Sequence, residues 1–288
     1  MQNILGIDIG GSHITMAQVH PEKREIIGST YIREHVDSFE PREIIFSAWV
    51  SAIEKAIWDL AKEELLIGIA MPGPFDYENG ISHMQQGKFM DIYQANIKEE
   101  LAQRLSISKD QIYFVNDAAA FLEGEVFGGC VKEYKRIFGV TLGTGLGTTF
   151  YDGTVATDED LWDSPLKDSI CEDYLATRWF INRYAELTGE TISGTKDLLE
   201  KPEDIQTKMF GEYADSFAEF ITKYVRSYDP EVLVIGGNIA KAYPYFEKRF
   251  TQNLIENNIH LPVKISAIFE DAAILGAASY ALKNLKNK

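Results

Sequence analysis

The 288-residue sequence predicts an α/β protein built from two similar halves, and three observations support this prediction. Short apolar segments of strand character alternate with amphipathic helical segments, as in α/β folds. A glycine-rich turn between two strand-like segments occurs twice, around Gly10 and around Gly143. Hydrophobic residues make up 45% of the chain, so it can bury either one large core or two lobes that share a cleft.

In the first half, apolar runs and the residues that interrupt them define the elements. The predicted order is strand 3–9, strand 13–19, helix 43–62, strand 65–71, helix 97–105 and strand 111–115. Pro41 introduces the first helix, in which isoleucine and alanine recur at helical spacing. Pro72, Gly73 and Pro74 follow the third strand and form either a rigid turn or a substrate-facing loop.

The second half repeats this plan. The predicted order is strand 136–142, a turn over 143–147, strand 148–151, helices 172–187 and 203–228, strand 232–235 and an alanine-rich helix that begins near Ala272. We place the division between the lobes near Val115. Residues 1–115 with 272–288 would then form a small lobe, and residues 116–271 a large one.

Charge and composition argue against several classes of protein. The formal net charge of −16, with no cluster of Lys or Arg, disfavours a nucleic-acid partner. No segment resembles a secretion signal or is long enough to cross a bilayer, so we expect a cytoplasmic protein with no membrane partner. Cys130 and Cys171 lie far apart and the five histidines lack ligand spacing, so neither a disulfide framework nor a structural zinc site is expected.

The first glycine turn combines Asp8, Gly10, Gly11 and Ser12 after an apolar strand. Residues without a Cβ let consecutive backbone N–H groups approach a phosphate, and Asp8 can hold Mg²⁺ through water. Alternatively, the glycines only supply positive φ angles to a hairpin turn. A Walker A loop is excluded, because no Gly-Lys-Ser/Thr follows and the next segment resembles a strand.

The second glycine turn offers Gly143, Thr144, Gly145 and Gly147 between two strands, with several N–H donors that can point inward together. A bulged hairpin is the structural alternative. Because the same arrangement occurs twice, we favour a pair of turns that hold a polyphosphate between them.

Asn116 and Asp117 stand at the end of a strand and the start of a helix. Asp117 fits the N-cap position, where an aspartate often has a purely structural role. The same position suits catalysis, because a helix N-terminus keeps a carboxylate ionised and able to accept a proton from a bound hydroxyl group. Asn116 can orient such a substrate by hydrogen bonding.

Gly236 and Gly237 follow the strand 232–235. Their lack of side chains lets a flat adenosine lie against the backbone. A simple strand-to-helix turn is the alternative, and only the two preceding phosphate-type turns favour a nucleotide contact.

Together, these segments resemble the ROK family of bacterial sugar kinases and related regulators over essentially the whole chain. The segments that resemble family motifs are, in chain order, 8–12 (first phosphate motif), 72–74 (substrate-side loop), 116–118 (catalytic aspartate), 142–145 (second phosphate motif), 229–237 (adenosine side) and 273–278 (closing helix). The order of the motifs is the specific part of the resemblance.

The sequence departs from the family pattern between Gly153 and Cys171. The family's Gly-Glu-x-Gly-His segment and its zinc-binding cysteine cluster have no full counterpart there, so the comparison implies no zinc. The resemblance carries the sugar-contacting glutamate at the end of that cluster to Glu172. Alternatively, Glu172 only stabilises the first turn of a helix.

The resemblance implies an actin-like, hexokinase-like ATPase (ribonuclease H-like) fold with an active site in the cleft between two lobes. It also implies an ATP- and Mg²⁺-dependent sugar kinase in which Asp117 is the base. The remaining site residues would then be Asn116, Glu172, Gly73 and Pro74 for the sugar, and Asp8, Gly10, Gly11, Ser12, Gly143, Thr144, Gly145, Gly147, Gly236 and Gly237 for Mg-ATP.

The expected acceptor is O6 of glucose or a related hexose, and family analogy implies a homodimer. An N-acetylhexosamine kinase and a non-catalytic sugar-sensing protein are the alternatives. A nucleotide-driven chaperone or actin-like protein ranks last, because an Asn-Asp pair suits a small hydroxylated substrate better.

Overall fold

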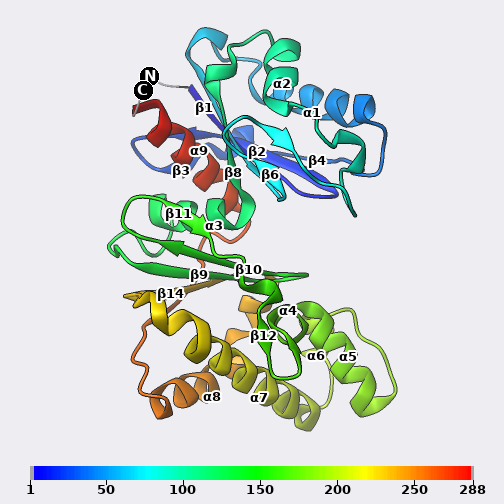
Figure 1. Cartoon of the computed structure of the whole chain (residues 1–288), viewed down its shortest axis with the longest axis vertical. Helices are drawn as coiled ribbons and strands as arrows, with labels where there is room; N and C mark the ends of the chain where they lie inside the picture. Colours follow the sequence, from blue (N-terminus) through cyan, green and yellow to red (C-terminus); the bar gives the residue numbers. More distant parts are fainter. Residues whose placement is uncertain (1–2, 287–288) are drawn as a thin grey trace. The chain divides into compact units, whose positions relative to one another are not determined.

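The structure is a computed structural model that describes residues 3–286, and it divides into two compact units (Figure 1). Unit 1 comprises the described residues up to Lys132 together with those from Glu270 onward, and unit 2 is Glu133–Phe269. Our expected division near Val115 differs from this one. The reason is that helix α3 (Asp117–Phe127) packs on the C-terminal helix α9 (Asp271–Lys286) within unit 1.

Unit 1 is organised around a six-stranded sheet with the order β3-β2-β1-β5-β8, in which β4 also pairs with β2. Its strands are β1 (Asn3–Ile9), β2 (His13–His20), β3 (Glu25–Ile26), β4 (Ile32–His35), β5 (Leu65–Met71) and β8 (Ile112–Asn116). The pair β1 and β2 is antiparallel, which confirms the predicted opening hairpin. The strands β1, β5 and β8 run parallel to one another.

The remaining elements of unit 1 are short or helical. They are α1 (Arg42–Ala56), α2 (Ile97–Leu105), the hairpin of β6 (Phe75–Asp76) and β7 (Ile81–Ser82), and the 3₁₀ turns η1 (Gly28–Thr30), η2 (Lys62–Glu64), η3 (Met90–Ile92) and η4 (Lys109–Gln111). The predicted helix 97–105 and strand 65–71 are confirmed to the residue. The helix predicted over 43–62 ends early, at Ala56, because its buried face stops at Ile57 and Trp58 is 81% exposed.

The two faces of this sheet are covered by different helices. Alternate residues such as Leu5 and Ile67 join α1 and α2 in one hydrophobic core. On the opposite face α9 packs against β1 and β5. Glycines allow this contact: an added Cβ would lie 2.1 Å from a backbone oxygen of α9 at Gly6 and 1.9 Å from one at Gly68.

The same close approach joins α9 to α3. An added Cβ at Gly276 would lie 1.7 Å from the carbonyl oxygen of Ala120, and one at Gly124 would lie 1.9 Å from that of Ala272. Backbone is therefore in contact with backbone, and the alanine-rich pattern near the C-terminus reflects this packing. The position of α3, which bears Asp117, is fixed by it.

Unit 2 has a five-stranded sheet with the order β11-β10-β9-β14-β15. Its strands are β9 (Ile137–Leu142), β10 (Leu146–Tyr151), β11 (Ala156–Asp158), β14 (Val232–Gly236) and β15 (Val263–Ile265), and a separate hairpin is formed by β12 (Pro165–Leu166) and β13 (Ser169–Ile170). The pair β9 and β10 is antiparallel, whereas β9, β14 and β15 are parallel. A glycine-turned hairpin next to parallel strands therefore occurs in both units.

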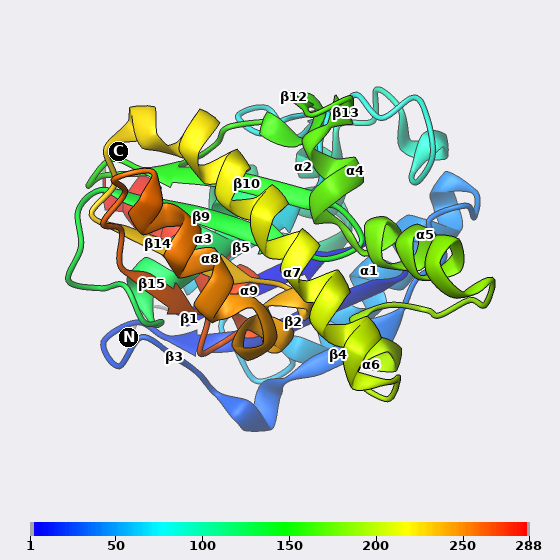
Figure 2. The same cartoon turned by 90° about the horizontal axis from the view of Figure 1, so that it is seen from below.

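The helices of unit 2 pack around an aromatic core. They are α4 (Cys171–Leu175), α5 (Thr177–Thr188), α6 (Thr195–Leu198), α7 (Glu203–Phe220) and α8 (Tyr243–Glu256), with the short turns η5 (Leu161–Asp163), η6 (Ile221–Val225, a π-helix), η7 (Arg226–Tyr228) and η8 (Asn238–Ala242). Figure 2 shows α7 and α8 side by side, and Phe217 stacks on Phe250 with ring centroids 4.6 Å apart. None of the helices described is long and apolar enough to span a membrane.

Two helix predictions in unit 2 are wrong in detail. The stretch 172–187 is two helices, because Ala176 adopts an extended conformation between them. The stretch 203–228 is α-helical only to Phe220 and then continues as a π-helix and a 3₁₀ turn. The strand predicted over 148–151 begins earlier, at Leu146.

Candidate active site

Three of the predicted site segments follow neighbouring parallel strands of unit 1. Asp8 on β1 is opposite Ala70 on β5, and Ala70 is opposite Val115 on β8. Asp8, Ala70 and Val115 therefore lie side by side on three neighbouring strands. The backbones at Asp8 and Val115 are two strand spacings apart, about 10 Å. The first glycine turn, the loop 72–74 and the pair 116–117 all lie at the carboxyl edge, where open α/β sheets bind ligands.

The first glycine turn joins β1 to β2 and presents two backbone donors. The N–H of Gly10 donates to the carbonyl oxygen of His13 at 2.9 Å. Within the described part of the chain, the N–H groups of Gly11 and Ser12 have no hydrogen-bond acceptor. Neither glycine has a positive φ, so our alternative explanation of the glycines is wrong. Two adjacent unused N–H groups suit an anion such as phosphate.

Lys88, which the sequence analysis did not single out, lies over this turn. A Cβ added to Gly11 would lie 2.0 Å from Cδ and 2.7 Å from Nζ of Lys88. The absence of a side chain at Gly11 therefore makes room for the lysine. A lone lysine in a polar loop carries no sequence signal of such an approach.

Asn116, rather than Asp117, caps helix α3, which corrects our N-cap assignment. The Oδ1 atom of Asn116 accepts hydrogen bonds from the N–H groups of Ala118 at 2.8 Å and Ala119 at 3.1 Å. The Nδ2 atom of Asn116 donates to the hydroxyl group of Tyr77 at 3.2 Å. One amide hydrogen of Asn116 is left for a substrate.

Asp117 is thus the first residue of α3, and its environment raises its pKa. The side chain reaches solvent, but desolvation by the surrounding protein raises the pKa of the carboxyl group above its ordinary value. The N–H of Ala118, which donates to Oδ1 at 2.9 Å, and the charge of Lys88 act in the opposite direction. We expected the helix N-terminus to lower the pKa of Asp117, but desolvation has the larger effect and raises it. A carboxyl group with a raised pKa is better matched to proton transfer near neutral pH.

Asp8, near the end of β1, is half-buried and strongly perturbed. Its pKa is raised from 3.8 to about 7, mainly by burial and then by the negative charge of Asp117, whereas the charge of Arg33 acts in the opposite direction. Arg33 itself forms an ion pair with Glu270, with 2.7 Å between a guanidinium nitrogen and Oε2. Two desolvated carboxyl groups that disfavour each other's ionisation are a suitable environment for a cation.

The loop 72–74 is held next to Asn116 by Tyr77. The hydroxyl group of Tyr77 donates to the carbonyl oxygen of Met71 at 3.1 Å and lies 3.4 Å from the position of a Cβ at Gly73. The carbonyl oxygen of Pro74 accepts a hydrogen bond from the N–H of His83 at 3.0 Å. Gly73, Pro74 and Asn116, which we assigned to one substrate, are therefore neighbours.

In unit 2, the second glycine turn spans 143–145 between β9 and β10. The N–H of Gly143 donates to the carbonyl oxygen of Gly145 at 3.1 Å, and Thr177 fixes the carbonyl of Gly143 through its N–H and its hydroxyl group. The N–H groups of Thr144 and Gly145 have no acceptor among the described residues. Gly147 lies inside β10 opposite Thr141, and not in the turn as we predicted.

Glu172, in the first turn of α4, reaches the second glycine turn. Its Oε2 atom accepts a hydrogen bond from the N–H of Leu146 at 3.1 Å, and its Oε1 atom pairs with Arg178 at 2.8 Å. A Cβ at Gly145 would lie only 2.9 Å from Oε2. The glycine therefore admits the carboxylate. The role of Arg178 was not predicted, because helical periodicity does not show that its guanidinium group turns back to Glu172.

Gly236 and Gly237 lie directly beside the second turn. Gly236 ends β14 opposite Thr141 of β9. Gly237 has a φ of +82°, and a Cβ there would lie 2.3 Å from the carbonyl oxygen of Leu142. Only glycine fits both the conformation and the space. The two glycine segments that we assigned to the nucleotide are therefore brought together within unit 2.

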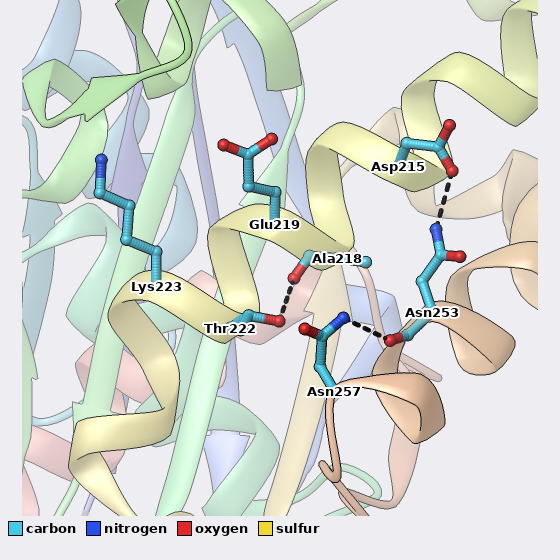
Figure 3. A pocket seen from close by; sticks show the side chains of 7 residues that line it. All are labelled: Asp215, Ala218, Glu219, Thr222, Lys223, Asn253 and Asn257. Atoms are coloured by element: carbon cyan, nitrogen blue, oxygen red, sulfur yellow. Dashed lines mark hydrogen bonds between the residues drawn. The ribbon is translucent and has the colours of Figure 1, made fainter.

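Unit 2 also has a pocket away from these segments, between α7, η6 and α8 (Figure 3). It is lined by Asp215, Ala218, Glu219, Thr222, Lys223, Asn253 and Asn257. The side-chain amide of Asn253 donates to the carboxylate of Asp215 at 2.7 Å, so these two polar groups of the pocket bond to each other. The pocket contains none of the predicted site residues. Among residues 3–286, no group of three or more His, Cys, Asp and Glu side chains is arranged to hold a metal ion.

Comparison with known proteins agrees with this architecture. The chain is 24% identical over 315 residues to a glucokinase of Thermotoga maritima, with 96% of each chain covered. It is also 24% identical over 316 residues to an N-acetyl-D-glucosamine kinase of Mannheimia succiniciproducens, covering 97% of this chain and 99% of the relative.

A solved ROK family glucokinase from Streptomyces griseus, in complex with glucose and AMPPNP, superposes with a TM-score of 0.76 at 20% identity, covering 98% of this chain and 99% of that one. This likeness confirms the predicted α/β fold of the actin-like ATPase type.

A sequence model of the ROK family matches residues 4–157 and 168–284. The unmatched residues 158–167 lie within the stretch where we found the family's Gly-Glu-x-Gly-His segment to lack a counterpart. Because the match covers nearly all of the chain, the resemblance noted in the sequence is confirmed: this protein belongs to the ROK family.

Proposed function

We propose that this protein is an ATP-dependent sugar kinase that transfers the γ-phosphate of ATP to a hexose hydroxyl group. The observation that carries the proposal is the position of Asp117, a carboxyl group with a raised pKa at the same sheet edge as the donors of the first glycine turn. Relatives named glucokinase and N-acetyl-D-glucosamine kinase support this class of reaction. Glucose and N-acetylglucosamine are therefore the first acceptors to consider.

In the proposed reaction, the sugar oxygen attacks the γ-phosphorus. The new O–P bond forms as the bond from phosphorus to the β–γ bridging oxygen breaks, and ADP leaves with that bridging oxygen. Asp117 accepts the hydroxyl proton and later releases it to solvent. Phosphoryl transfer depends mainly on positioning and on neutralising charge, so the fixed position of Asp117 on α3 is its main contribution.

Sugar contacts are assigned to the residues around Asp117. Asn116 has one amide hydrogen left for a hydroxyl group, and Gly73 and Pro74 form the adjacent loop. Glu172 completes the set in this proposal, since a carboxylate that already accepts from Leu146 and Arg178 is well oriented and can still accept from a sugar hydroxyl.

ATP is assigned to the glycine segments. Gly10, Gly11 and Ser12 in unit 1, and Gly143, Thr144 and Gly145 in unit 2, are proposed to bind phosphate groups, and Gly236 and Gly237 the adenosine. The unused N–H groups at both turns support this proposal, as does the AMPPNP in the glucokinase from Streptomyces griseus. Gly147 is proposed only to support the second turn from β10.

Asp8 is the residue proposed to hold Mg²⁺, through water. Burial and, after it, the negative charge of Asp117 raise the pKa of its carboxyl group, and a divalent cation would stabilise the ionised form. Mg²⁺ is commonly bound by one or two carboxylates together with substrate phosphates. When bound, the ion would neutralise charge on the phosphates.

The acceptor atom and the assembly are proposed on family resemblance, and the location on the sequence. The acceptor atom is O6 of glucose or a related hexose, with an N-acetylhexosamine as the other substrate class. The protein works as a homodimer in the cytoplasm.

The test is a coupled ADP-release assay with Mg-ATP against glucose, mannose, N-acetylglucosamine, N-acetylmannosamine and β-glucosides. We expect a sugar-dependent signal that falls at least about 100-fold in Asp117→Asn and Asp117→Ala. Asp204→Asn is the matched control, because Asp204 is an exposed aspartate in the first turn of another helix, α7.

Two results would contradict the proposal. Near-normal turnover by Asp117→Ala would exclude Asp117 as the base. Silence of the wild type across the panel, with sugar or ATP binding demonstrated by calorimetry, would favour a non-catalytic sugar sensor instead.

A further inference from the structure

The side chain of Lys88 lies against the first glycine turn, and the backbone next to Lys88 is anchored in the core of unit 1. The residue belongs to the segment between β7 and η3, and its side chain runs over Gly11, where an added Cβ would lie 2.4 Å from Cε. The contact runs from Cδ, the nearest atom at 2.0 Å, to Nζ at 2.7 Å, so both the end of the stem and the ammonium group of Lys88 lie next to the turn.

The next residue anchors this segment to the core of unit 1. Phe89 is fully buried and packs against Trp49, with ring centroids 5.6 Å apart. The N–H of Phe89 donates to the carbonyl oxygen of Ser38 at 3.0 Å. The backbone of Lys88, directly before this anchor, is therefore fixed on the side of unit 1 that carries the first glycine turn.

The ammonium group of Lys88 forms no hydrogen bond or ion pair with any residue that the structure describes. Other lysines of unit 1 do have acidic partners: Lys55 pairs with Glu34 and Lys283 with Glu123, each at 2.7 Å. In a chain with a net charge of −16, such pairing is readily available. Lys88 is instead directed at a turn whose N–H donors are also unused.

The cation also acts on the proposed base. The field of Lys88 lowers the pKa of Asp117, against the larger effect of desolvation. The charge of Lys88 therefore reaches Asp117, while its side chain lies over Gly11. Arg33, the other cation whose charge reaches this edge, is already paired with Glu270.

We propose that Lys88 binds the phosphoryl group as it reaches the sugar oxygen, and then holds the phosphate of the sugar phosphate product. The inference rests on the proposed function. During transfer, the phosphoryl group must lie beside the hydroxyl group whose proton Asp117 accepts, and it carries negative charge on its non-bridging oxygens. The ammonium group of Lys88, which lies over Gly11 and whose charge also reaches Asp117, supplies positive charge at that edge of the sheet.

The test compares Lys88→Met, which keeps the length without the charge, with Lys88→Arg, which keeps the charge. Binding of glucose 6-phosphate, N-acetylglucosamine 6-phosphate and the two free sugars is measured by calorimetry, and turnover by ADP release. Lys109→Met is the matched control, because Lys109 is an exposed lysine of unit 1 that, among residues 3–286, pairs only with the exposed Glu99, at 3.8 Å.

In Lys88→Met we expect the affinity for the sugar phosphate to fall about 10- to 100-fold, with the affinity for the free sugar unchanged. The value of kcat should fall about 100-fold, with KM for the sugar nearly constant. Lys88→Arg should recover a large part of both losses, and Lys109→Met should resemble the wild type.

Three outcomes would overturn the role of Lys88: equal sugar phosphate affinity in Lys88→Met and wild type, an equal loss for the free sugar, or no sugar phosphate binding by the wild type. Failure of the proposed function looks different. In that case the wild type itself would turn over no sugar, whereas the binding comparison would still decide whether Lys88 recognises a sugar-linked phosphate.

Discussion

Asn116 caps helix α3, and by doing so it makes Asp117 the first residue of that helix. The Oδ1 atom of Asn116 accepts from two backbone N–H groups, and Nδ2 holds the hydroxyl group of Tyr77. The residue before the proposed base therefore joins the helix to the loop 72–74. Its contribution to stability can be separated from its contribution to substrate binding.

Replacement of Asn116 by alanine is expected to lower the free energy of unfolding by about 1–3 kcal/mol, because the cap and the contact with Tyr77 are both lost. Urea unfolding measures this change. Asn116→Asp retains a good capping oxygen, so it should keep most of the stability but lose activity through the extra charge beside Asp117. Equal urea midpoints for Asn116→Ala and the wild type would contradict the capping role.

The perturbed pKa of Asp8 predicts a pH-dependent stability. Its pKa is about 7 in the folded chain and 3.8 ordinarily, so the folded state binds more protons between these values. The resulting stabilisation is complete below the lower value and is lost as the pH rises to about 7.

Asp8→Asn should remove this dependence. Without ligands, the free energy of unfolding of the wild type relative to Asp8→Asn should fall by roughly 1–4 kcal/mol from pH 4 to pH 7, and then level off. Urea unfolding at several pH values measures it. A difference that does not vary with pH would show that Asp8 titrates normally.

Two glycines of the second turn form a matched pair for testing ligand approach. A Cβ at Gly143 meets no atom within 4 Å, whereas one at Gly145 lies 2.9 Å from the carboxylate of Glu172. Gly143→Ala should leave the free energy of unfolding within about 1 kcal/mol of the wild type. If the turn binds phosphate, the same change should weaken ATP binding, measured by calorimetry.

Gly145→Ala should instead displace Glu172 from the N–H of Leu146. Both stability and sugar turnover are then expected to decrease, with a stability loss of about 1–3 kcal/mol. Unchanged ATP affinity in Gly143→Ala would argue against the turn as a phosphate site.

Because the backbones of α9 and α3 are in contact at Gly276, we predict that this position does not tolerate a side chain. A Cβ there would lie 1.7 Å from the carbonyl oxygen of Ala120, so Gly276→Ala must push the helices apart. We expect a loss of roughly 3 kcal/mol or more by thermal or urea unfolding. Gly28→Ala is the control, since no atom lies within 4 Å of its Cβ and its φ is not positive. Similar midpoints for the two variants would contradict the close packing.

The elements that the sequence predicted best are those with strong local signals. The apolar run 65–71 is bounded by Pro72, and the helix 97–105 begins after Asn96, whose side chain caps it. Both were placed to the residue. The two glycine hairpins were likewise predictable, because glycine, apolar alternation and polar turns occur within a few neighbouring residues.

The predictions that failed depended on contacts between distant parts of the chain. The helix predicted over 172–187 is interrupted at Ala176, where the chain turns so that Thr177 can donate to the carbonyl of Gly143. The pKa of Asp117 is raised by desolvation, which outweighs the effect of the helix N-terminus. This desolvation comes from protein that folds around the carboxyl group. Neither effect has a counterpart in the local sequence.

The alternation of strands and helices, the two glycine turns and the family motifs can be read from the amino-acid order, because they depend on backbone conformation and residue order over short distances. Three features required the three-dimensional fold: the approach of Lys88 to Gly11, the cap at Asn116 rather than Asp117, and the packing of α3 with α9. These features arise from packing between segments far apart in the chain. Such packing depends on shape and space in three dimensions, which hydrophobic periodicity does not encode.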